Sequence, residues 1–183
     1  MTNAQLDDQG RPEPPLATGE IGTLLGFLDF QRATLEWKCR DLRDEQLRTV
    51  LPPSSLTLGG MLKHLAYVED YWFVETVGEQ PAPPPWGEVD WRADSDWDWH
   101  SAAKESGQAL RGRWAERVEN SRAIVAEQLA NPVSEPLAHT YPAWDGRAEV
   151  SLRWVLTHMI VEYARHNGHA DLLREAIDGQ TGG

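Results

Sequence analysis

The amino-acid sequence predicts an all-α protein, a four-helix bundle with long loops between the helices. Two observations lead to this expectation. In four long segments apolar residues recur every three to four positions, which is the pattern of amphipathic helices that bury one face. No segment shows the strict alternation of apolar and polar residues that half-buried strands show. Four such helices with long connections describe a bundle, and the length of 183 residues suits one domain.

The first helix is expected to follow a flexible N-terminal arm, residues 1–19, which has no apolar period; the bundle domain then spans 20–183. The apolar stripe of this helix consists of Ile21, Leu24, Leu25, Leu28, Leu35, Cys39 and Leu42. The second helix starts after Thr57, a favourable N-cap residue, and ends near Gly78. Its stripe consists of Leu58, Met61, Leu62, Leu65, Val68 and Trp72.

An irregular segment from Gln80 to about Trp99 separates the second helix from the third. Prolines at four of the positions 81–85 forbid a helix, and acidic residues then alternate with tryptophans. A loop of this length is often functional, as a lid or a binding loop. The alternative is a solvated connection whose tryptophans cover the end of the bundle. Both interpretations stay open for residues 86–99.

Two further helices complete the bundle. The third is expected from about Ser101 to Leu129, where Asn131 and Pro132 end it. A second irregular stretch follows, and the fourth helix is expected over 150–177.

Composition excludes several classes of protein. The chain carries 29 acidic and 17 basic residues, a net charge of −12, so neither nucleic acid nor an anionic membrane is expected as a partner. The single cysteine, Cys39, excludes an internal disulfide and any zinc site made of several cysteines. The chain has no 18-residue apolar run, and its N-terminus is unlike a signal peptide, so a cytoplasmic protein is expected.

Polar residues on the expected inner faces point to a metal site. His158, Glu162, His166 and His169 fall within an arc of about 80° on the fourth helix. His64 lies beside the apolar stripe of the second helix. Two imidazoles and one carboxylate with an open fourth position are typical of catalytic zinc, and nickel or iron also accept this donor set. Spacing alone leaves a second interpretation open, since an inward histidine is often a hydrogen-bonded core residue.

Two segments carry a family resemblance. The segment LGGMLKHLAYVE at 58–69 resembles the second-helix motif of the DinB/YfiT-like bundle superfamily. The segment WVLTHMIVEYARHNGHADLLRE at 154–175 resembles that superfamily's last-helix motif and is the more specific of the two. The resemblance covers the helix order from about residue 20 to 178, and it implies a DinB-like four-helix bundle.

The resemblance also implies a set of metal ligands. Many members of the superfamily hold a divalent metal with three histidines, whereas here Glu162 replaces the first histidine of the last helix. The set His64, Glu162 and His166 is similar to that of the mycothiol-dependent maleylpyruvate isomerase and thiol S-transferase branch, where zinc is bound this way. His169 matches a recurrent position of this branch. Its expected role is to orient a ligand by a hydrogen bond, and the alternative is a structural contact with a neighbouring helix.

The function that the resemblance implies is a zinc-dependent thiol transferase or isomerase. It would activate a small thiol such as mycothiol for attack on an electrophile. One alternative is a hydrolase that uses metal-bound water. A second is a non-catalytic stress-response bundle. Bundles of this kind are often dimers, so a homodimer stays open by analogy with them.

Overall fold

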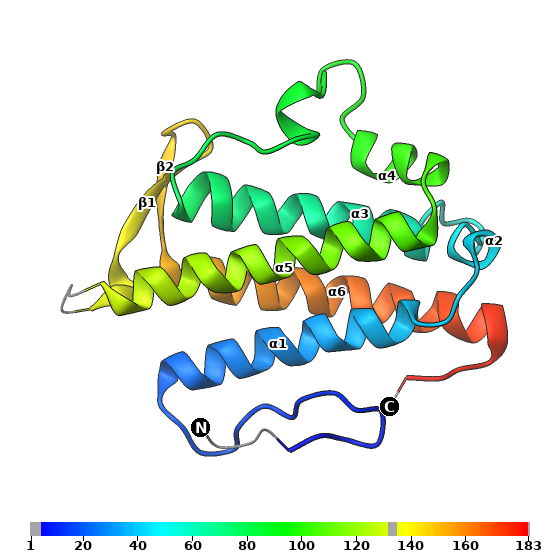
Figure 1. Ribbon diagram of the computed structural model, residues 1–183, viewed down its shortest axis with the longest axis horizontal. Coiled ribbons are helices and arrows are strands. Elements are labelled where there is room, and N and C mark those ends of the chain that lie inside the picture. Colours follow the sequence, from blue (N-terminus) through cyan, green and yellow to red (C-terminus); the bar gives the residue numbers. More distant parts are fainter. Residues whose placement is uncertain (1–4, 132–134, 183) are drawn as a thin grey trace. The chain divides into compact units, whose positions relative to one another are not determined.

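We analysed a computed structural model, which describes residues 5–131 and 135–182 (Figure 1). The protein is mostly helical, with one small two-stranded sheet. Residues 1–4 of the predicted arm, Gly183 of the predicted bundle domain and the predicted helix stop Pro132 lie outside the described residues. The long helical segments are α1 (Glu20–Cys39), α3 (Leu58–Glu69) with its π-helical continuation η1 (Asp70–Val77), α5 (Gly107–Ala130) and α6 (Leu152–Asp178).

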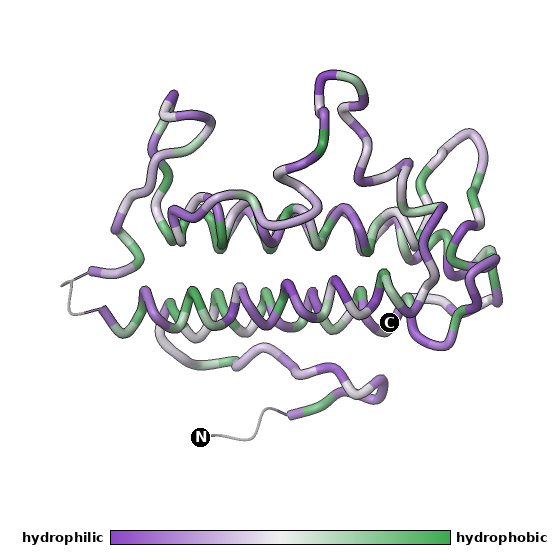
Figure 2. Tube along the Cα trace, turned by 45° about the horizontal axis from the view of Figure 1, so that its top comes forward, coloured by the Kyte–Doolittle hydropathy of each residue, from purple (hydrophilic) through white to green (hydrophobic). Residues whose placement is uncertain are grey.

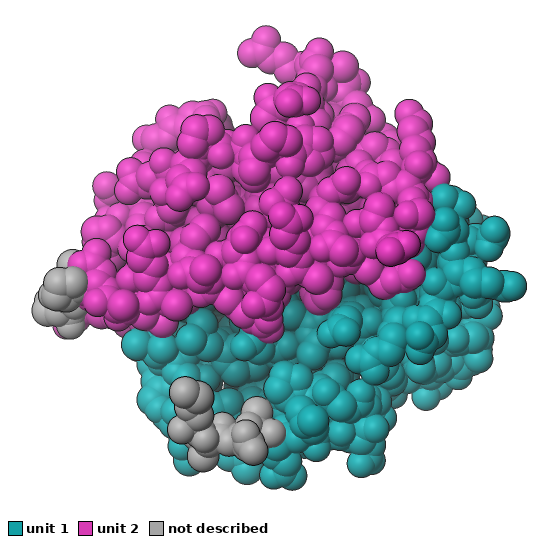
Figure 3. Space-filling view, viewed as in Figure 1, with its two compact units in different colours: residues 1–58, 156–183 teal, residues 59–155 magenta. Residues whose placement is uncertain are grey.

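These four helical segments follow the predicted order. Hydrophobic and hydrophilic positions are interspersed along each of them (Figure 2). The chain divides into two compact units, residues 1–58 with 156–183 and residues 59–155 (Figure 3). No helix in the described part of the chain is long and apolar enough to cross a membrane.

In the first unit, α1 and α6 run in the same direction and are joined by polar side chains of α6. The amide nitrogen of Asn167 donates to the backbone oxygen of Gln31 at 2.9 Å and to its side-chain oxygen at 2.7 Å. Seven residues further along both helices, the guanidinium of Arg174 donates to the backbone oxygens of Lys38 and Arg40, each at 2.9 Å. Arg174 therefore satisfies carbonyl groups that the C-terminus of α1 leaves without helical partners.

One buried arginine attaches the described part of the N-terminal arm to α1. Arg11 is 5% exposed, and its Nε lies 2.7 Å from a carboxylate oxygen of Asp7. Its Nη1 donates to the hydroxyl of Thr34 at 3.2 Å. The guanidinium carbon lies 4.7 Å from the ring centre of Phe30 and 4.8 Å from that of Trp37. These contacts fix the position of the arm against one face of α1.

In the second unit, the continuous helix formed by α3 and η1 runs in the same direction as α5. Lys63, near the start of α3, lies 2.6 Å from Glu105, just before α5, and Asp70 lies 2.9 Å from Arg117 in the middle of α5. Two consecutive parallel helices need a connection that returns the chain to the starting end. The segment 78–106, here called the crossover, makes this connection, which explains its length.

The π-helix η1 ends at Gly78. The backbone N–H of Gly78 donates to the carbonyl of Phe73, five residues earlier, at 2.8 Å, which is the π-helical pattern. A Cβ at position 78 would lie 2.8 Å from the carbonyl oxygen of Val74, so only glycine fits without a shift of the backbone.

The crossover contains short helical turns that the sequence analysis did not predict: η2 (Trp86–Glu88), α4 (Trp97–Ser101) and η3 (Ala102–Lys104). The third long helix begins at Gly107 and not near Ser101. The reason is local, because the backbone of Glu105 is extended and the hydroxyl of Ser106 caps the new helix by accepting from the N–H of Ala109 at 3.2 Å.

The chain is broadly all-α, as predicted, but it also contains a small hairpin that the sequence analysis did not predict. Strand β1 (Thr140–Ala143) pairs antiparallel with β2 (Ala148–Ser151), and the buried residues Tyr141 and Val150 are partners. Each strand has four residues, which is too short for an alternation of apolar and polar residues to stand out. Because β2 occupies 148–151, the last helix begins at Leu152. The short helix α2 (Asp44–Leu47) follows α1.

Candidate metal centre

His64 lies on α3, where the crossover packs against it. Its Nδ1 is 2.6 Å from Oδ2 of Asp98, and its ring stacks on the indole of Trp99 with 4.5 Å between ring centres. The side chain of His64 is 17% exposed and that of Asp98 is 4% exposed. Both contacting residues belong to α4, so one short helical turn positions the imidazole from two sides.

Glu162 and His166 stand one turn apart on α6. Oε1 of Glu162 lies 3.2 Å from Nε2 of His166. Their side chains are 15% and 7% exposed, so both are largely withdrawn from water. The second carboxylate oxygen of Glu162 lies 3.9 Å from the guanidinium of Arg165, which is itself exposed.

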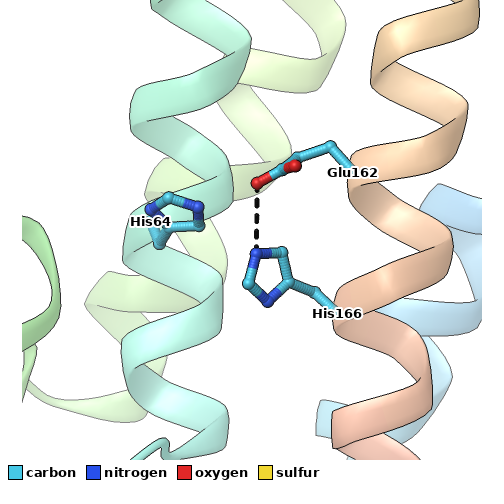
Figure 4. Close-up of side chains that lie close together, drawn as sticks. All are labelled: His64, Glu162 and His166. Atoms are coloured by element: carbon cyan, nitrogen blue, oxygen red, sulfur yellow. Dashed lines mark hydrogen bonds and ion pairs between the residues drawn. The ribbon is translucent and has the colours of Figure 1, made fainter.

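Figure 4 shows the side chains of His64, Glu162 and His166. Each offers one ligand atom, and these atoms all lie within 4.8 Å of one another. Ligand atoms in a tetrahedral zinc site lie roughly 3.4 Å apart, as follows from zinc–ligand distances of about 2.1 Å. The donor set, two imidazoles and one carboxylate, is one that divalent cations such as zinc accept.

The two other histidines of the predicted arc lie near this group on α6. The ring of His169 contacts that of His166 at a steep angle, with 5.6 Å between centres. Nδ1 of His169 has no hydrogen-bond partner among the described residues, so its role in orienting a ligand stays a prediction. Burial lowers the pKa of His158, and the charge of Glu162 opposes part of this effect.

Asp98 is the residue that the sequence analysis missed. From the sequence, Asp98 was treated only as one of several acidic residues that alternate with tryptophans. A signal was present, since Asp98 has a tryptophan on each side in the sequence WDW. A carboxylate between two large aromatic residues is placed to be buried with them, and Asp98 is 3% exposed.

The tryptophans of the crossover cover one side of α3 and η1. Trp86 and Trp91 both contact the ring of Tyr67, at 5.4 and 4.6 Å between centres. The indole of Trp97 lies 4.0 Å from the ammonium of Lys63. Eight of the nine tryptophans belong to the unit 59–155, and four of these eight lie in the crossover.

Besides Asp98, the acid Asp70 is also buried; it lies at the start of η1, which continues the helix that carries His64. Asp70 accepts a hydrogen bond from the indole N–H of Trp86 at 2.6 Å and lies 2.9 Å from Nε of Arg117. Burial raises the pKa of Asp70 to about 6, although the hydrogen bond from Trp86 and the charge of Arg117 act in the opposite direction. Asp70 and Arg117 also line a cavity of about 310 Å³ between η1, the crossover and α5.

These features define a helical protein with a two-histidine, one-glutamate group of candidate metal ligands. Residues 23–179 match the family model described as mycothiol-S-transferase, and the chain belongs to this family, which lies within the DinB-like superfamily. The match confirms the family resemblance. A comparison with curated proteins gave no match.

Proposed function

We propose that this protein is a metal-dependent mycothiol S-transferase. The observation that carries the proposal is the group His64, Glu162 and His166, whose ligand atoms lie within 4.8 Å of one another in a chain of the mycothiol S-transferase family. Zinc is the first metal to test, because two imidazoles, one carboxylate and an open position are the usual donors of catalytic zinc. Nickel and iron fit the same donors.

The residues of the site have distinct roles in this proposal. His64 and His166 supply neutral nitrogen donors, and Glu162 supplies the single negative charge. A bound divalent cation would lower the pKa of a thiol and hold it as a thiolate at neutral pH. The low exposure of Glu162 and His166 limits access of bulk water to the thiol sulfur.

The overall reaction joins the sulfur of mycothiol to an electrophilic carbon of the second substrate. A sulfur–carbon bond forms, and the thiol proton is lost to solvent or a base. The leaving group departs with the bonding electron pair, or a proton adds to the neighbouring carbon when the electrophile is an activated alkene. Addition followed by elimination of the same thiol would isomerise the alkene, which is the related isomerase activity.

We also propose that residues 20–183 form one domain in which the four long helices pack as a bundle. Support comes from the family match over 23–179 and from the four helical segments. Unfolding of the protein, followed by tryptophan fluorescence and by circular dichroism, tests this. We expect a single cooperative transition that is the same for both signals. We further propose a cytoplasmic location. We also propose a homodimer, and light scattering of the purified chain tests its molar mass directly.

The activity is tested with mycothiol and an activated aryl chloride, with product formation followed by absorbance. The zinc-loaded protein is expected to conjugate the thiol faster than the uncatalysed reaction, and His64→Ala is expected to lose most of this rate. Cysteine in place of mycothiol controls for thiol specificity. Hydrolysis of esters or amides without conjugation would point to a metal-dependent hydrolase. No activity with either substrate class would favour a non-catalytic bundle and contradict the proposal.

A further inference from the structure

The strongest unexplained feature of the second unit is the buried carboxylate of Asp98. Among the described residues, this carboxylate has one hydrogen-bond partner, Nδ1 of His64, which lies 2.6 Å from Oδ2. Asp98 is 3% exposed, and a carboxylate buried this deeply is costly unless a charged or strongly donating partner compensates for its lost hydration. A neutral imidazole is a modest partner, whereas an imidazole that carries a cation on its other nitrogen is a strong one.

The local structure holds Asp98 in place on both sides. Trp99 stacks on His64 at 4.5 Å, and Trp97 packs over Lys63, the residue before His64, at 4.0 Å. Three consecutive residues of α4 therefore contact two consecutive residues of α3. This arrangement fixes the direction of the Asp98 carboxylate, which a single exposed loop acid could not achieve.

The hydrogen bond selects one form of the imidazole. An ionised carboxylate has only acceptor atoms, so Nδ1 of His64 must carry the hydrogen and donate it. The neutral ring then has its lone pair on Nε2, and Nε2 becomes the nitrogen that binds a metal. A carboxylate on the far nitrogen of a metal-binding histidine orients the ring and raises its basicity.

We propose that Asp98 is a positioning residue that fixes His64 as a metal ligand through Nε2 and thereby couples the crossover to the metal centre. The inference rests on the proposed function, because it assigns a role toward the metal of that site. The coupling is reciprocal: the hydrogen bond to Asp98 strengthens metal binding by His64, and a cation bound to His64 strengthens that hydrogen bond.

Zinc affinity tests the proposal. The full-length protein, Asp98→Ala and Asp98→Asn are each titrated with Zn²⁺ against a chelating indicator. Asp98→Ala is expected to bind Zn²⁺ about 10- to 100-fold more weakly. Asp98→Asn, which keeps a neutral acceptor of the same shape, is expected to lose less. Asp94→Ala is the matched control, because Asp94 also pairs with a histidine of the crossover, His100, at 3.0 Å, but on the exposed surface.

Asp94→Ala should bind Zn²⁺ within twofold of the unchanged protein. Affinity of Asp98→Ala within threefold of the unchanged protein would overturn the proposal. An equal loss in Asp94→Ala would also overturn it, since the effect would then belong to general disturbance of the crossover. If Asp98→Ala does not fold, Asp98→Asn decides the question by the same titration.

A second measurement does not depend on metal. Nitrogen-15 NMR of the metal-free protein reports which ring nitrogen of His64 carries the hydrogen. The expected result is an Nδ1–H ring in the unchanged protein and a shift toward Nε2–H in Asp98→Ala. The same form in both proteins would overturn the role of Asp98. Failure of the unchanged protein to bind Zn²⁺ would contradict the proposed function and the coupling to a metal, whereas the NMR result would then still show that Asp98 sets which nitrogen of His64 carries the hydrogen.

Discussion

Oε1 of Glu162 lies 3.2 Å from Nε2 of His166, one turn further along α6. This pair already has the spacing that two ligands of one tetrahedral ion adopt, about 3.4 Å. The helix α6 therefore places two of the three proposed ligands next to each other without any contribution from distant parts of the chain. His64 is the third proposed ligand.

Replacement of the glutamate tests its contribution of charge. Glu162→Gln keeps the shape but removes the single negative charge of the donor set, so zinc affinity should fall more than tenfold. Zinc content after dialysis, measured by plasma emission spectrometry, reports the change. Glu175→Gln, an exposed glutamate on the same helix, is the control and should retain full zinc. Equal zinc content in the two variants would exclude Glu162 as a ligand.

Zinc should stabilise the fold by mass action. A ligand that binds only the folded state at 100 times its dissociation constant adds about 2.7 kcal/mol to the free energy of unfolding. For a chain of this size that is a rise in Tm of roughly 5–10 °C. Differential scanning fluorimetry checks the shift, and a chelator should reverse it. A similar rise in His64→Ala would mean that zinc binds elsewhere.

The buried acid Asp70 predicts a dependence of stability on pH. Burial raises its pKa from 3.8 to about 6, so the folded state holds the proton more tightly than the unfolded state. The stabilisation from this proton is fully present below pH 3.8 and is lost as the pH rises through about 6. Between pH 4 and 7 the free energy of unfolding should therefore fall, by up to about 3 kcal/mol from this group.

Asp70→Asn isolates this contribution, because the amide does not titrate. Urea unfolding at pH 4.5 and pH 7.5 should give a smaller difference in free energy for the variant than for the unchanged protein. The comparison is necessary since burial also raises the pKa of Glu75, to about 7, and adds to the slope in both proteins. An unchanged difference would show that Asp70 titrates as in the unfolded chain.

Arg174 should contribute strongly to the stability of the first unit. It donates to the backbone oxygens of Lys38 and Arg40 and is 6% exposed. Arg174→Ala leaves the carbonyl groups of Lys38 and Arg40 without this donor, which should cost about 2–4 kcal/mol in the free energy of unfolding. Urea denaturation measures the loss. The exposed neighbour Glu175, replaced by alanine, should change stability by less than about 0.5 kcal/mol.

Patterns within one helix were predicted well from the sequence. The spacing of Glu162 and His166 places them on one face of a helix whatever else the chain does, and the four helical segments follow from apolar period alone. The position of His64 beside the apolar stripe of α3 follows from the same rule. These features depend on residues three or four positions apart, so a local pattern is sufficient to find them.

Contacts between distant residues could not be predicted in this way. Asp98 contacts His64 although the two residues are 34 positions apart in the sequence. Asp98 lies in a helical turn, within a segment whose prolines indicate only a loop. The hairpin at 140–151 depends on pairing between strands of four residues, and the buried Arg11 depends on aromatic rings of α1. In each case the stabilising partner lies far away in sequence, and periodicity carries no information about it.

The central claim is that the three residues hold a metal that binds the thiol of mycothiol. X-ray absorption at the zinc edge of the loaded protein measures the atoms around the ion. Without the thiol, nitrogen and oxygen neighbours at about 2.0–2.2 Å and no sulfur are expected. Addition of mycothiol should introduce one sulfur at about 2.3 Å, and His64→Ala should abolish this signal. A zinc environment unchanged by mycothiol would contradict the claim.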